Sequence, residues 1–339
     1  MLLTSKANLL RAIVHADPDH VPWAGEGALR LVDHAGRKPP RAGVDAWGVA
    51  WAPLPASYQA GVGEPAESYP IAPAASSVAE LLERSFPAVV PAMFAGLLEG
   101  LNGAETLVVG QHGAGLLDRF VQLLGMPAAL TALLSEPEAS GAVIARVADH
   151  HVQVAQGYLA AGAEAGWLAD DYAGDAGPLL SPRVWRRLFL PELARIIAVY
   201  RQAGAAVFFH TCGRAEAFIP DLLDAGVAVF NLQSDVCDLA QLKARHGRRI
   251  AFFGGVATEL MQRGPDDRIA AAACTAMWVL GREGGLILAP DQPLAYPPEH
   301  VAVLDEAARR AGRYPFSALH YLPVCTNTGA TRTPVAASV

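Results

Sequence analysis

A histidine and a cysteine stand two residues apart, at His210 and Cys212, directly after the apolar run 206–209. If this run is a β-strand, its extended continuation places both side chains on one side of the backbone, because side chains alternate along a strand. An imidazole and a thiolate that face the same way suit a zinc ion, which needs three or four ligands. The alternative is a histidine that bonds a neighbouring carboxylate beside an unreactive buried cysteine.

Two adjacent carboxylates, Asp170 and Asp171, follow another apolar run at 166–169. Neighbouring carboxylates raise one another's pKa, so that one of them can hold a proton at neutral pH and deliver it to a substrate. The same pair can orient polar groups of a substrate. The structural alternative is a helix N-cap together with a salt bridge.

Two amides, Asn231 and Gln233, have the same spacing and follow the run 227–230. Side-chain amides hydrogen-bond a carboxylate or a carbonyl of a ligand, or else they pin a loop. The pair Gly254-Gly255 ends the run 250–253 and indicates close approach of a ligand or of the chain, or a tight turn. Both pairs are therefore candidates for a binding role.

Polar residues recur at the ends of short apolar, β-branched or aromatic runs. Helical stretches separate the runs, as in strand–helix–strand crossovers, which build parallel sheets. In a closed barrel the carboxyl ends of all strands meet at one mouth, where barrel enzymes place their sites. The predicted strands are 106–109, 166–169, 206–209, 227–230, 250–253 and 286–289, and the polar residues after them are Gln111, His112, Asp170, Asp171, His210, Cys212, Asn231, Gln233, Asp291 and Gln292.

The predicted fold is one α/β domain, a (β/α)8 TIM-type barrel, since no G-x-G-x-x-G and no Walker loop follows a predicted strand. Residues 1–76 are rich in Pro, Gly and Trp and are expected to form an N-terminal lead-in packed on the barrel. The barrel itself is assigned to residues 77–325, and residues 326–339 to a flexible tail.

Caps and breakers mark the expected helices. Ser181 predicts the N-cap of a helix over 181–200, and a second helix is expected over 265–282, ended by a glycine pair. The N-terminus predicts a short amphipathic helix capped by Thr4 or Ser5 rather than a signal peptide.

The composition of the 339 residues, 52% apolar and 17% charged, predicts a densely packed globular chain. The net charge of −7 and the lack of a Lys/Arg block argue against nucleic acid as a partner. The apolar stretch 139–169 contains charged residues and is expected to be a buried helix, not a membrane span. The four cysteines are scattered, so we expect a reducing, cytoplasmic location without disulfides.

Short motifs follow one another in a fixed order over nearly the whole chain. They are Asn8-Leu9-Leu10-Arg11-Ala12, Asp45-Ala46-Trp47-Gly48-Val49, Asp170-Asp171, Leu180-Ser181-Pro182, Phe209-His210-Thr211-Cys212-Gly213, Phe253-Gly254-Gly255-Val256, Gly284-Gly285-Leu286-Ile287-Leu288-Ala289-Pro290 and Pro297-Pro298-Glu299. As an ordered set they resemble the uroporphyrinogen decarboxylase superfamily, which includes zinc-binding, corrinoid-dependent methyltransferases. The resemblance implies a barrel fold and an enzyme.

Within this superfamily the chain is more similar to the methyltransferase-like branch than to the decarboxylases of haem synthesis. The true decarboxylases carry an arginine-rich N-terminal loop that grips the carboxylates of a porphyrin. Residues 23–30 contain one arginine and one glutamate, so this stretch lacks such a cationic pocket.

The methyltransferase branch carries His-x-Cys and, much later, a third cysteine, which the resemblance aligns with residues 289–292. No cysteine stands there, and Asp291 is the candidate replacement ligand beside His210 and Cys212. Cys325 is an alternative ligand, and Glu26 is expected to be a ligand, a base or a contact to substrate.

The leading expectation is a metal-assisted methyl transfer or demethylation, in which zinc meets a small methylated compound or a methyl-corrinoid protein. One rival is a metal-free decarboxylase or lyase that acts on a small carboxylic acid, and another is a non-catalytic binding subunit. The expected catalytic residues are Asp170, Asp171 and His210, and the expected substrate contacts are Glu26, His112, Asn231, Gln233 and Gln292.

All of these functions require the His210 imidazole to face the carboxylates of residues 170 and 171 at one rim, within about a dozen ångströms. Aromatic residues either line the pocket or belong to the core, and the ones concerned are Trp47, Trp51, Tyr58 and Trp167. Related barrels often pair, so a homodimer is one expected assembly.

Overall fold

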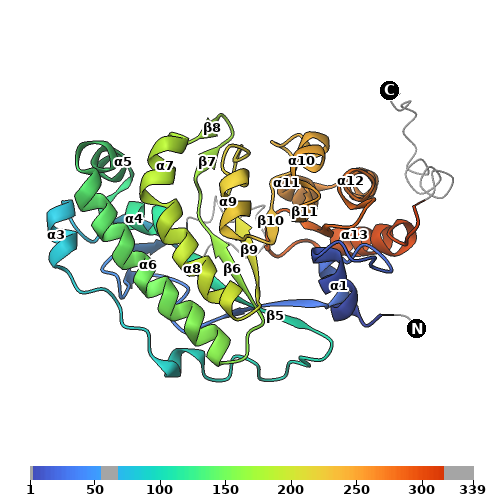
Figure 1. The fold of residues 1–339 in the computed structure, drawn as a ribbon, viewed down its shortest axis with the longest axis horizontal. Coiled ribbons are helices and arrows are strands. Elements are labelled where there is room, and N and C mark those ends of the chain that lie inside the picture. Colours follow the sequence, from blue (N-terminus) through green and yellow to red (C-terminus); the bar gives the residue numbers. More distant parts are fainter. Residues whose placement is uncertain (1–2, 55–67, 317–339) are drawn as a thin grey trace.

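The computed structural model describes residues 3–54 and 68–316 and is built around one seven-stranded sheet (Figure 1). Cys325, Tyr58 and the predicted tail lie outside the described residues. Every neighbouring pair of strands in this sheet is parallel. In sheet order the strands are β1 (Leu29–Asp33), β5 (Leu107–Ala114), β6 (Ala165–Ala169), β9 (Ala206–His210), β10 (Val229–Asn231), β11 (Ala251–Val256) and β12 (Leu286–Pro290).

The six strands predicted from apolar runs are all present, so the parallel α/β class is confirmed. β1 was not predicted, because Arg30 and Asp33 interrupt its apolar residues and its burial is only partial. A strand of this kind lacks the continuous apolar run that marks a strand covered on both faces. The main sheet therefore begins inside the segment that was expected to form a lead-in.

The sheet is strongly curled. The Leu288 N–H donates to the Pro22 carbonyl, and the Leu107 N–H donates to the Ala28 carbonyl, each at 2.8 Å. The six residues after Pro22 therefore reach from β12 to β5, and three of them form a short helical turn, so this segment spans no more than about 16 Å. In a flat sheet β12 and β5 are five strand spacings apart and would lie about 24 Å from each other. The two edges must therefore curve toward each other.

The predicted number of eight strands is not observed in the described part of the chain. At the eighth position the segment that leads into β1 makes a single parallel bridge, between Trp23 and Leu288. The short helical turn η1 (Ala24–Glu26) follows this bridge and turns the chain before β1 begins. The curled parallel sheet is barrel-like, with this segment lying between β12 and β5.

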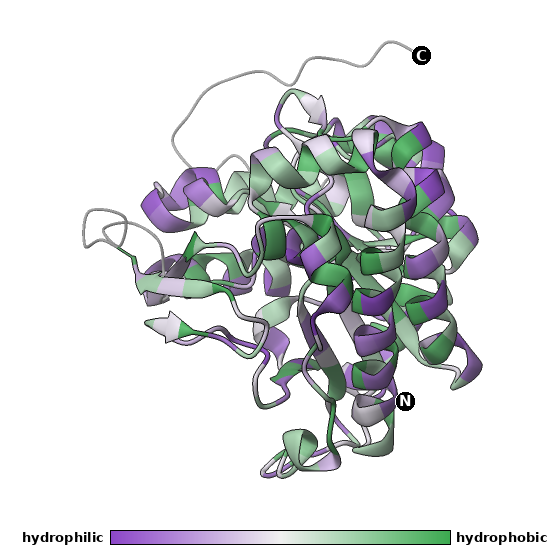
Figure 2. Cartoon of the chain, turned by 90° about the vertical axis from the view of Figure 1, so that its left-hand side faces the viewer, coloured by the Kyte–Doolittle hydropathy of each residue, from purple (hydrophilic) through white to green (hydrophobic). Residues whose placement is uncertain are grey.

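Helices cover the outer face of the sheet, and α6, α8 and α9 lie in front of the strands in Figure 1. Their apolar sides join the largest core cluster of the molecule. Figure 2 shows hydrophobic and hydrophilic residues mixed along the helices that face the viewer, as one-sided burial requires. The outer helices are α3 (Val78–Glu83), α4 (Leu116–Leu124), α5 (Met126–Ser135), α6 (Pro137–Ala160), α7 (Pro182–Leu188), α8 (Leu190–Gln202), α9 (Ile219–Ala225), α10 (Leu239–His246), α11 (Thr258–Arg263), α12 (Asp266–Ala276) and α13 (Pro298–Ala311).

The helix at the N-terminus, α1 (Ser5–Ile13), begins as predicted, since the Thr4 side chain accepts a hydrogen bond from the Ala7 N–H. Its apolar face adds Leu9 and Ile13 to the cluster inside the curled sheet. α1 thus covers one open end of the barrel-like sheet.

Two predicted helices are present but are interrupted. Ser181 caps α7 as expected, yet the predicted helix over 181–200 is two helices that meet at Phe189. Pro191 explains the break, because a proline lacks the N–H that would continue the preceding helix. The predicted helix over 265–282 begins as α12 and ends in a π-helical turn, η3 (Met277–Gly281).

Two small antiparallel sheets complete the fold. One consists of β2 (Gly43–Val44), β3 (Ala50–Pro53) and β4 (Ser68–Ala72), and the other of β7 (Ala173–Gly174) and β8 (Gly177–Pro178). The turn η2 (Pro91–Phe94) packs against α6. In the described part of the chain no single helix has the length and apolarity to cross a membrane. Only α4 and α5 taken together reach that length, and they are bent by 110° at their junction.

Candidate functional site

Asp171, His210 and Cys212 come together at the carboxyl ends of β6 and β9. One ligand atom from each lies within 4.8 Å of the other two. The His210 Nε2 atom is 3.4 Å from Cys212 Sγ and 3.9 Å from Asp171 Oδ1. The imidazole and the carboxylate therefore face each other at one rim, as every predicted function required. In the described part of the chain this is the one cluster of three ligand side chains of this kind.

The orientation of His210 follows from Asn231. The Asn231 side-chain N–H group donates to the carbonyls of Phe253 and Asp291, at 3.0 and 2.9 Å, so its oxygen must face His210. That oxygen lies 2.7 Å from His210 Nδ1, which therefore carries the proton. The Nε2 lone pair is then free and points at the cluster, as a metal ligand requires.

Burial sets the charge states of His210 and Cys212. It lowers the pKa of His210, against the opposing effect of Asp171, and so keeps the imidazole neutral. Burial, followed by the charge of Asp171, raises the pKa of the Cys212 thiol. A neutral imidazole is ready to bind a metal, whereas the thiol has to release its proton when a metal binds.

Asp171 is more accessible than His210, since 43% of its side chain is exposed against 12% for the imidazole. Its Oδ1 atom accepts a hydrogen bond from the Cys212 N–H at 2.9 Å, which ties the two strand ends together. This carboxylate can therefore contact both a metal and a substrate.

Asp170, by contrast, holds a helix. Its carboxylate accepts hydrogen bonds from the N–H groups of Leu116, Leu117 and Asp118, at 2.7 to 3.0 Å, at the start of α4. The side chain is buried, and burial raises its pKa to about 6. Asp170 therefore caps a helix, as the structural alternative predicted. The helix that it caps, α4, lies about 50 residues earlier in the sequence and does not follow Asp170 directly.

Asp291 is not placed as the third metal ligand. Its carboxylate accepts hydrogen bonds from the N–H and the hydroxyl of Ser234, both at 2.6 Å, and from the Gly255 N–H at 2.9 Å. Burial raises its pKa to about 6. Gly254 has a φ of +120°, and a Cβ there would lie 3.0 Å from the Asp291 carboxylate. The glycine pair thus allows close approach of the chain and of this carboxylate.

Side-chain alternation separates the two polar residues near the end of β5. Leu107 and Val109 belong to the cluster inside the curled sheet, so Gln111 also faces inward and His112 faces outward. His112 is buried between sheet and helices, where it bonds His151 at 3.1 Å and Tyr200 at 2.7 Å. The predicted substrate contact at His112 is therefore not at the mouth.

Glu26 is also remote from the cluster. It pairs with His20 at 2.8 Å, and its neighbour Gly27 accepts a bond from Thr106, which precedes β5. Glu26 therefore lies near the amino end of β5, away from the carboxyl ends that carry the cluster. Its expected role as a ligand or a base finds no support in this placement.

Gln233 and Gln292 lie beside the cluster. The Gln233 side-chain oxygen accepts a hydrogen bond from the Gly213 N–H and so fixes the loop that carries Cys212. The Gln292 side-chain N–H group is 3.9 Å from Cys212 Sγ. Both amides are half-buried, close enough to influence the thiol and anything bound to it.

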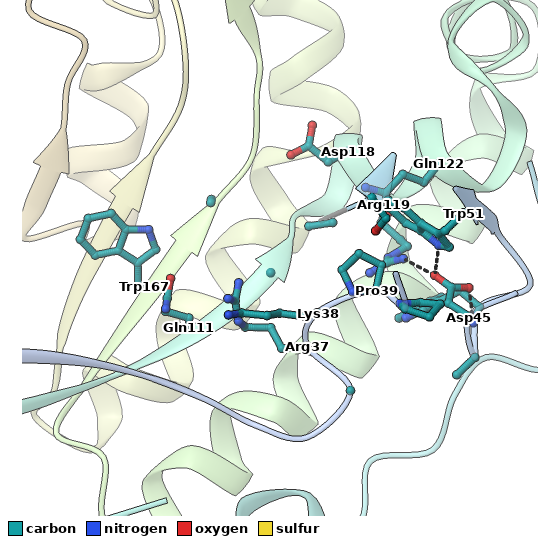
Figure 3. Close-up of a pocket in the computed structure, with 18 of the residues that line it drawn as sticks. Arg37, Lys38, Pro39, Asp45, Trp51, Gln111, Asp118, Arg119, Gln122 and Trp167 are labelled. Carbon is teal, nitrogen blue, oxygen red and sulfur yellow. Dashed lines mark hydrogen bonds and ion pairs between the residues drawn. The ribbon is translucent and has the colours of Figure 1, made fainter. Parts of the chain in front are cut away.

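A cavity of about 700 Å³ has His210 among its lining residues. Figure 3 shows other residues that line this cavity, among them Asp118, Arg119 and Trp167. The inner face of the sheet, the start of α4 and the small sheet β2–β4 form its walls. This volume suits a small organic ligand. Trp47, Trp51 and Trp167 line it although each is largely buried, so they serve both core and cavity. The polar and charged lining residues are Arg37, Lys38, Asp45, Ser68, Gln111, Asp118, Arg119, Gln122 and His210.

Several of these lining residues were not predicted from the sequence. Asp118 and Arg119 open α4, where acidic residues commonly serve the helix dipole, so nothing marked them as site residues. Burial and the charges of Asp170 and Asp171 raise the pKa of Asp118 well above its usual range. One signal could have identified them: α4 follows β5 directly in the sequence. In a barrel, the start of a helix that follows a strand lies at the mouth.

Together the fold and the cluster define an α/β barrel-like protein whose mouth brings nitrogen, sulfur and oxygen donor atoms together, and one of these residues, His210, also lines a cavity. The chain belongs to the uroporphyrinogen decarboxylase (URO-D) family, whose model matches residues 75–311. This confirms the resemblance that the ordered motifs indicated.

Similar proteins lie in the methyltransferase-like branch of this superfamily. The methylcobamide:CoM methyltransferase MtaA of Methanosarcina barkeri is 28% identical over 141 residues, which are 41% of this chain and 39% of that protein. The match thus spans well under half the length of this curated relative. A methyltransferase from Methanosarcina mazei superposes with a TM-score of 0.70 over 91% of this chain and 98% of its own, at 18% identity, and so shows the same fold.

Proposed function

We propose that this chain is a metal-assisted methyltransferase or demethylase that acts on a small methylated compound. The observation that carries the proposal is the cluster of Asp171, His210 and Cys212, since His210 also lines the large cavity. Membership of the URO-D family and the methyltransferase relatives support the same reaction class.

The three side chains fit a zinc ion. Nitrogen, sulfur and oxygen are the donor atoms that zinc accepts in proteins, and three protein ligands leave one position open for a substrate. The Asn231 oxygen accepts a hydrogen bond from His210 Nδ1 and so directs the lone pair of Nε2 at the cluster. Zinc bound there would supply Lewis acidity and hold a substrate thiol as a thiolate.

The other residues position and enclose the substrate. Asp171 is exposed enough to contact it, and Gln233 fixes the loop that carries Cys212. Asp170 anchors the first turn of α4, which places Asp118 and Arg119 in the cavity wall. A substrate held over His210 would be surrounded on several sides and its reacting atom kept close to the cluster.

We further propose that a corrinoid, carried by a partner protein, is the second methyl carrier. The support is the name of the relative, a methylcobamide:CoM methyltransferase. Methylated cobalamin and its demethylated form differ in their visible spectra. The exchange can therefore be followed directly with free methylcobalamin.

Zinc stoichiometry tests the proposal. After zinc loading and gel filtration, we expect about one equivalent in the wild-type protein and almost none in Cys212→Ser. Cys237→Ser is the matched control, because Cys237 is a half-buried free thiol outside the cluster. Methylcobalamin should lose its methyl group to a small thiol acceptor with wild type and control but not with Cys212→Ser.

Equal zinc contents in wild type and Cys212→Ser would reject the metal site. Zinc-free protein that releases CO2 from a small carboxylic acid would instead establish the decarboxylase, the rival predicted from the sequence. Lack of both reactions with a full equivalent of zinc would leave only a binding role.

A further inference from the structure

The Arg119 side chain is a buried cation that donates no hydrogen bond in the described part of the chain. Only 9% of the residue is exposed, and its Nε and Nη1 atoms are buried without an acceptor. Burial lowers its pKa to about 10, so the side chain is still positively charged at neutral pH. A buried guanidinium without acceptors is costly, because arginine brings five N–H donors.

The nearest acid does not satisfy these donors. Asp45 lies 3.7 Å from Arg119 Nη1, an ion pair longer than a hydrogen bond (Figure 3). The Asp45 carboxylate instead accepts hydrogen bonds from the N–H groups of Trp47 and Val49 and from the Trp51 indole, each at 2.9 Å. Asp45 therefore organises the β2–β3 turn. It partly balances the charge of Arg119 but accepts no hydrogen bond from the guanidinium.

Arg119 is also fixed in place. Its guanidinium lies 4.4 Å from the centre of the Trp47 ring, a cation–π contact that holds its plane. Arg146 provides an instructive contrast, since it lies 4.4 Å from the Phe86 ring in the same way. Arg146, however, donates to the backbone carbonyls of Leu81, Leu82 and Arg84, so its donors are used. Arg119 has the same stacked geometry, but its Nε and Nη1 donors have no acceptor among the described residues.

Arg119 and His210 line the same cavity, and the surroundings favour an anion. Arg37 and Lys38 also line the cavity and share one carboxylate, that of Asp33. Lys38 lies 3.6 Å from that carboxylate and is largely exposed, so its charge is only weakly compensated. The cavity lining also contains two carboxylates, those of Asp45 and Asp118, against three cations.

We propose that Arg119 binds the anionic end of the substrate, a carboxylate or sulfonate, while the reacting end of the same molecule lies at the His210–Cys212–Asp171 cluster. An oxyanion accepts parallel hydrogen bonds from a guanidinium, which a neutral substrate cannot do. This inference deepens the proposed function by naming the substrate class, and it rests on that function only for the identity of the reacting end.

Paired thiols that differ only in charge test the inference. We compare 3-mercaptopropionate with 3-mercaptopropanamide, and 3-mercaptopropanesulfonate distinguishes a sulfonate from a carboxylate site. Binding is followed by tryptophan fluorescence, because three tryptophans line the cavity. The wild-type protein should bind one of the two anions at least about tenfold more tightly than the amide, the effect of one charge-assisted hydrogen bond.

In Arg119→Met this preference should fall to within about twofold, since the replacement keeps the stem but has no donor. Arg146→Met is the control for loss of a stacked arginine and should keep the full preference. Arg119→Lys, which keeps the charge, should retain part of the preference and is informative if Arg119→Met does not fold. Circular dichroism verifies the fold of each variant.

An unchanged anion preference in Arg119→Met, or equal binding of anions and amide by the wild type, would overturn the inference. The ratio of anion to amide binding does not depend on zinc, because both members of a pair carry the same thiol. Failure of the proposed function appears separately, as thiol affinities that do not change when zinc is added.

Discussion

Two buried histidines near strand ends, His210 and His112, have opposite surroundings. Burial lowers the pKa of both, that of His112 to about 3. His210 faces the inside of the curled sheet, and Asn231 holds it so that one nitrogen is free. His112 faces outward, and the protein bonds both of its nitrogens, through His151 and Tyr200. The difference shows that a polar residue near a strand end is available for chemistry only when strand alternation turns it inward.

The largest expected effect contrasts the two histidines directly. His210→Ala should lower methyl-transfer activity about a thousandfold, as expected for the loss of several kcal/mol of metal-dependent stabilisation. His112→Phe should retain zinc and much of the activity but lose about 3 kcal/mol of stability, because two buried partners lose their hydrogen bond. Activity assays and urea unfolding measure the two effects. A folded His112→Phe protein without activity would break the comparison.

A change of intermediate size is expected when Asn231 is replaced, because its bond to His210 Nδ1 leaves Nε2 available for a metal. Asn231→Leu removes the acceptor for Nδ1 while keeping a similar volume, and we expect zinc affinity to fall by about 10–100-fold. Competition with a chromophoric chelator measures the affinity. Ser234→Ala, which removes a hydroxyl bonded to Asp291 outside the cluster, is the control. Equal affinities in Asn231→Leu and wild type would show that His210 does not need this partner.

The smallest effect concerns acidity around the outward-facing histidine. The pKa of His112 is lowered by burial first and then by His34 and His150, so the unfolded chain binds a proton that the folded one excludes. Its contribution to stability is complete above the unfolded pKa of about 6.5 and declines as the pH falls toward 3. Between pH 7.5 and 5.5 the stability difference between wild type and His112→Phe should shrink by about 1.4 kcal/mol.

Buried acids act in the opposite direction and make the variant comparison necessary. Asp170 and Asp291 have pKa values raised to about 6, so each favours the folded state in acid and opposes it as the pH rises through that value. They are present in both proteins, and subtraction removes their effect. A difference in unfolding free energy that stays constant from pH 7.5 to 5.5 would contradict the assignment to His112.

Much of the fold followed from local patterns. The apolar runs located six strands, and Thr4 and Ser181 cap helices as predicted, because period, cap and breaker are properties of a few consecutive residues. β1 was not predicted because polar residues interrupt its apolar pattern, and only its pairing with β5 shows that it is a strand. The break at Pro191 was visible in the sequence but was not used.

The site was predicted in part, and the boundary between success and failure has a physical cause. The pair His210 and Cys212 was recognisable because both residues lie on one strand end, and Asp171 follows the neighbouring strand. Asp291 and Glu26 could not be assigned from the sequence, since hydrogen-bond partners far along the chain decide whether a carboxylate is free. The donors of Arg119 became significant only with the cavity around them.

By itself the sequence determined the family, the parallel α/β class and the pairing of His210 with Cys212, because these depend on residue type and on spacing within single segments. Only the tertiary structure decided which polar side chains face the cavity, which carboxylates are already engaged, and which cation lacks an acceptor. These properties arise from contacts between distant segments, and the curvature of the sheet, not the local sequence, brings those segments together.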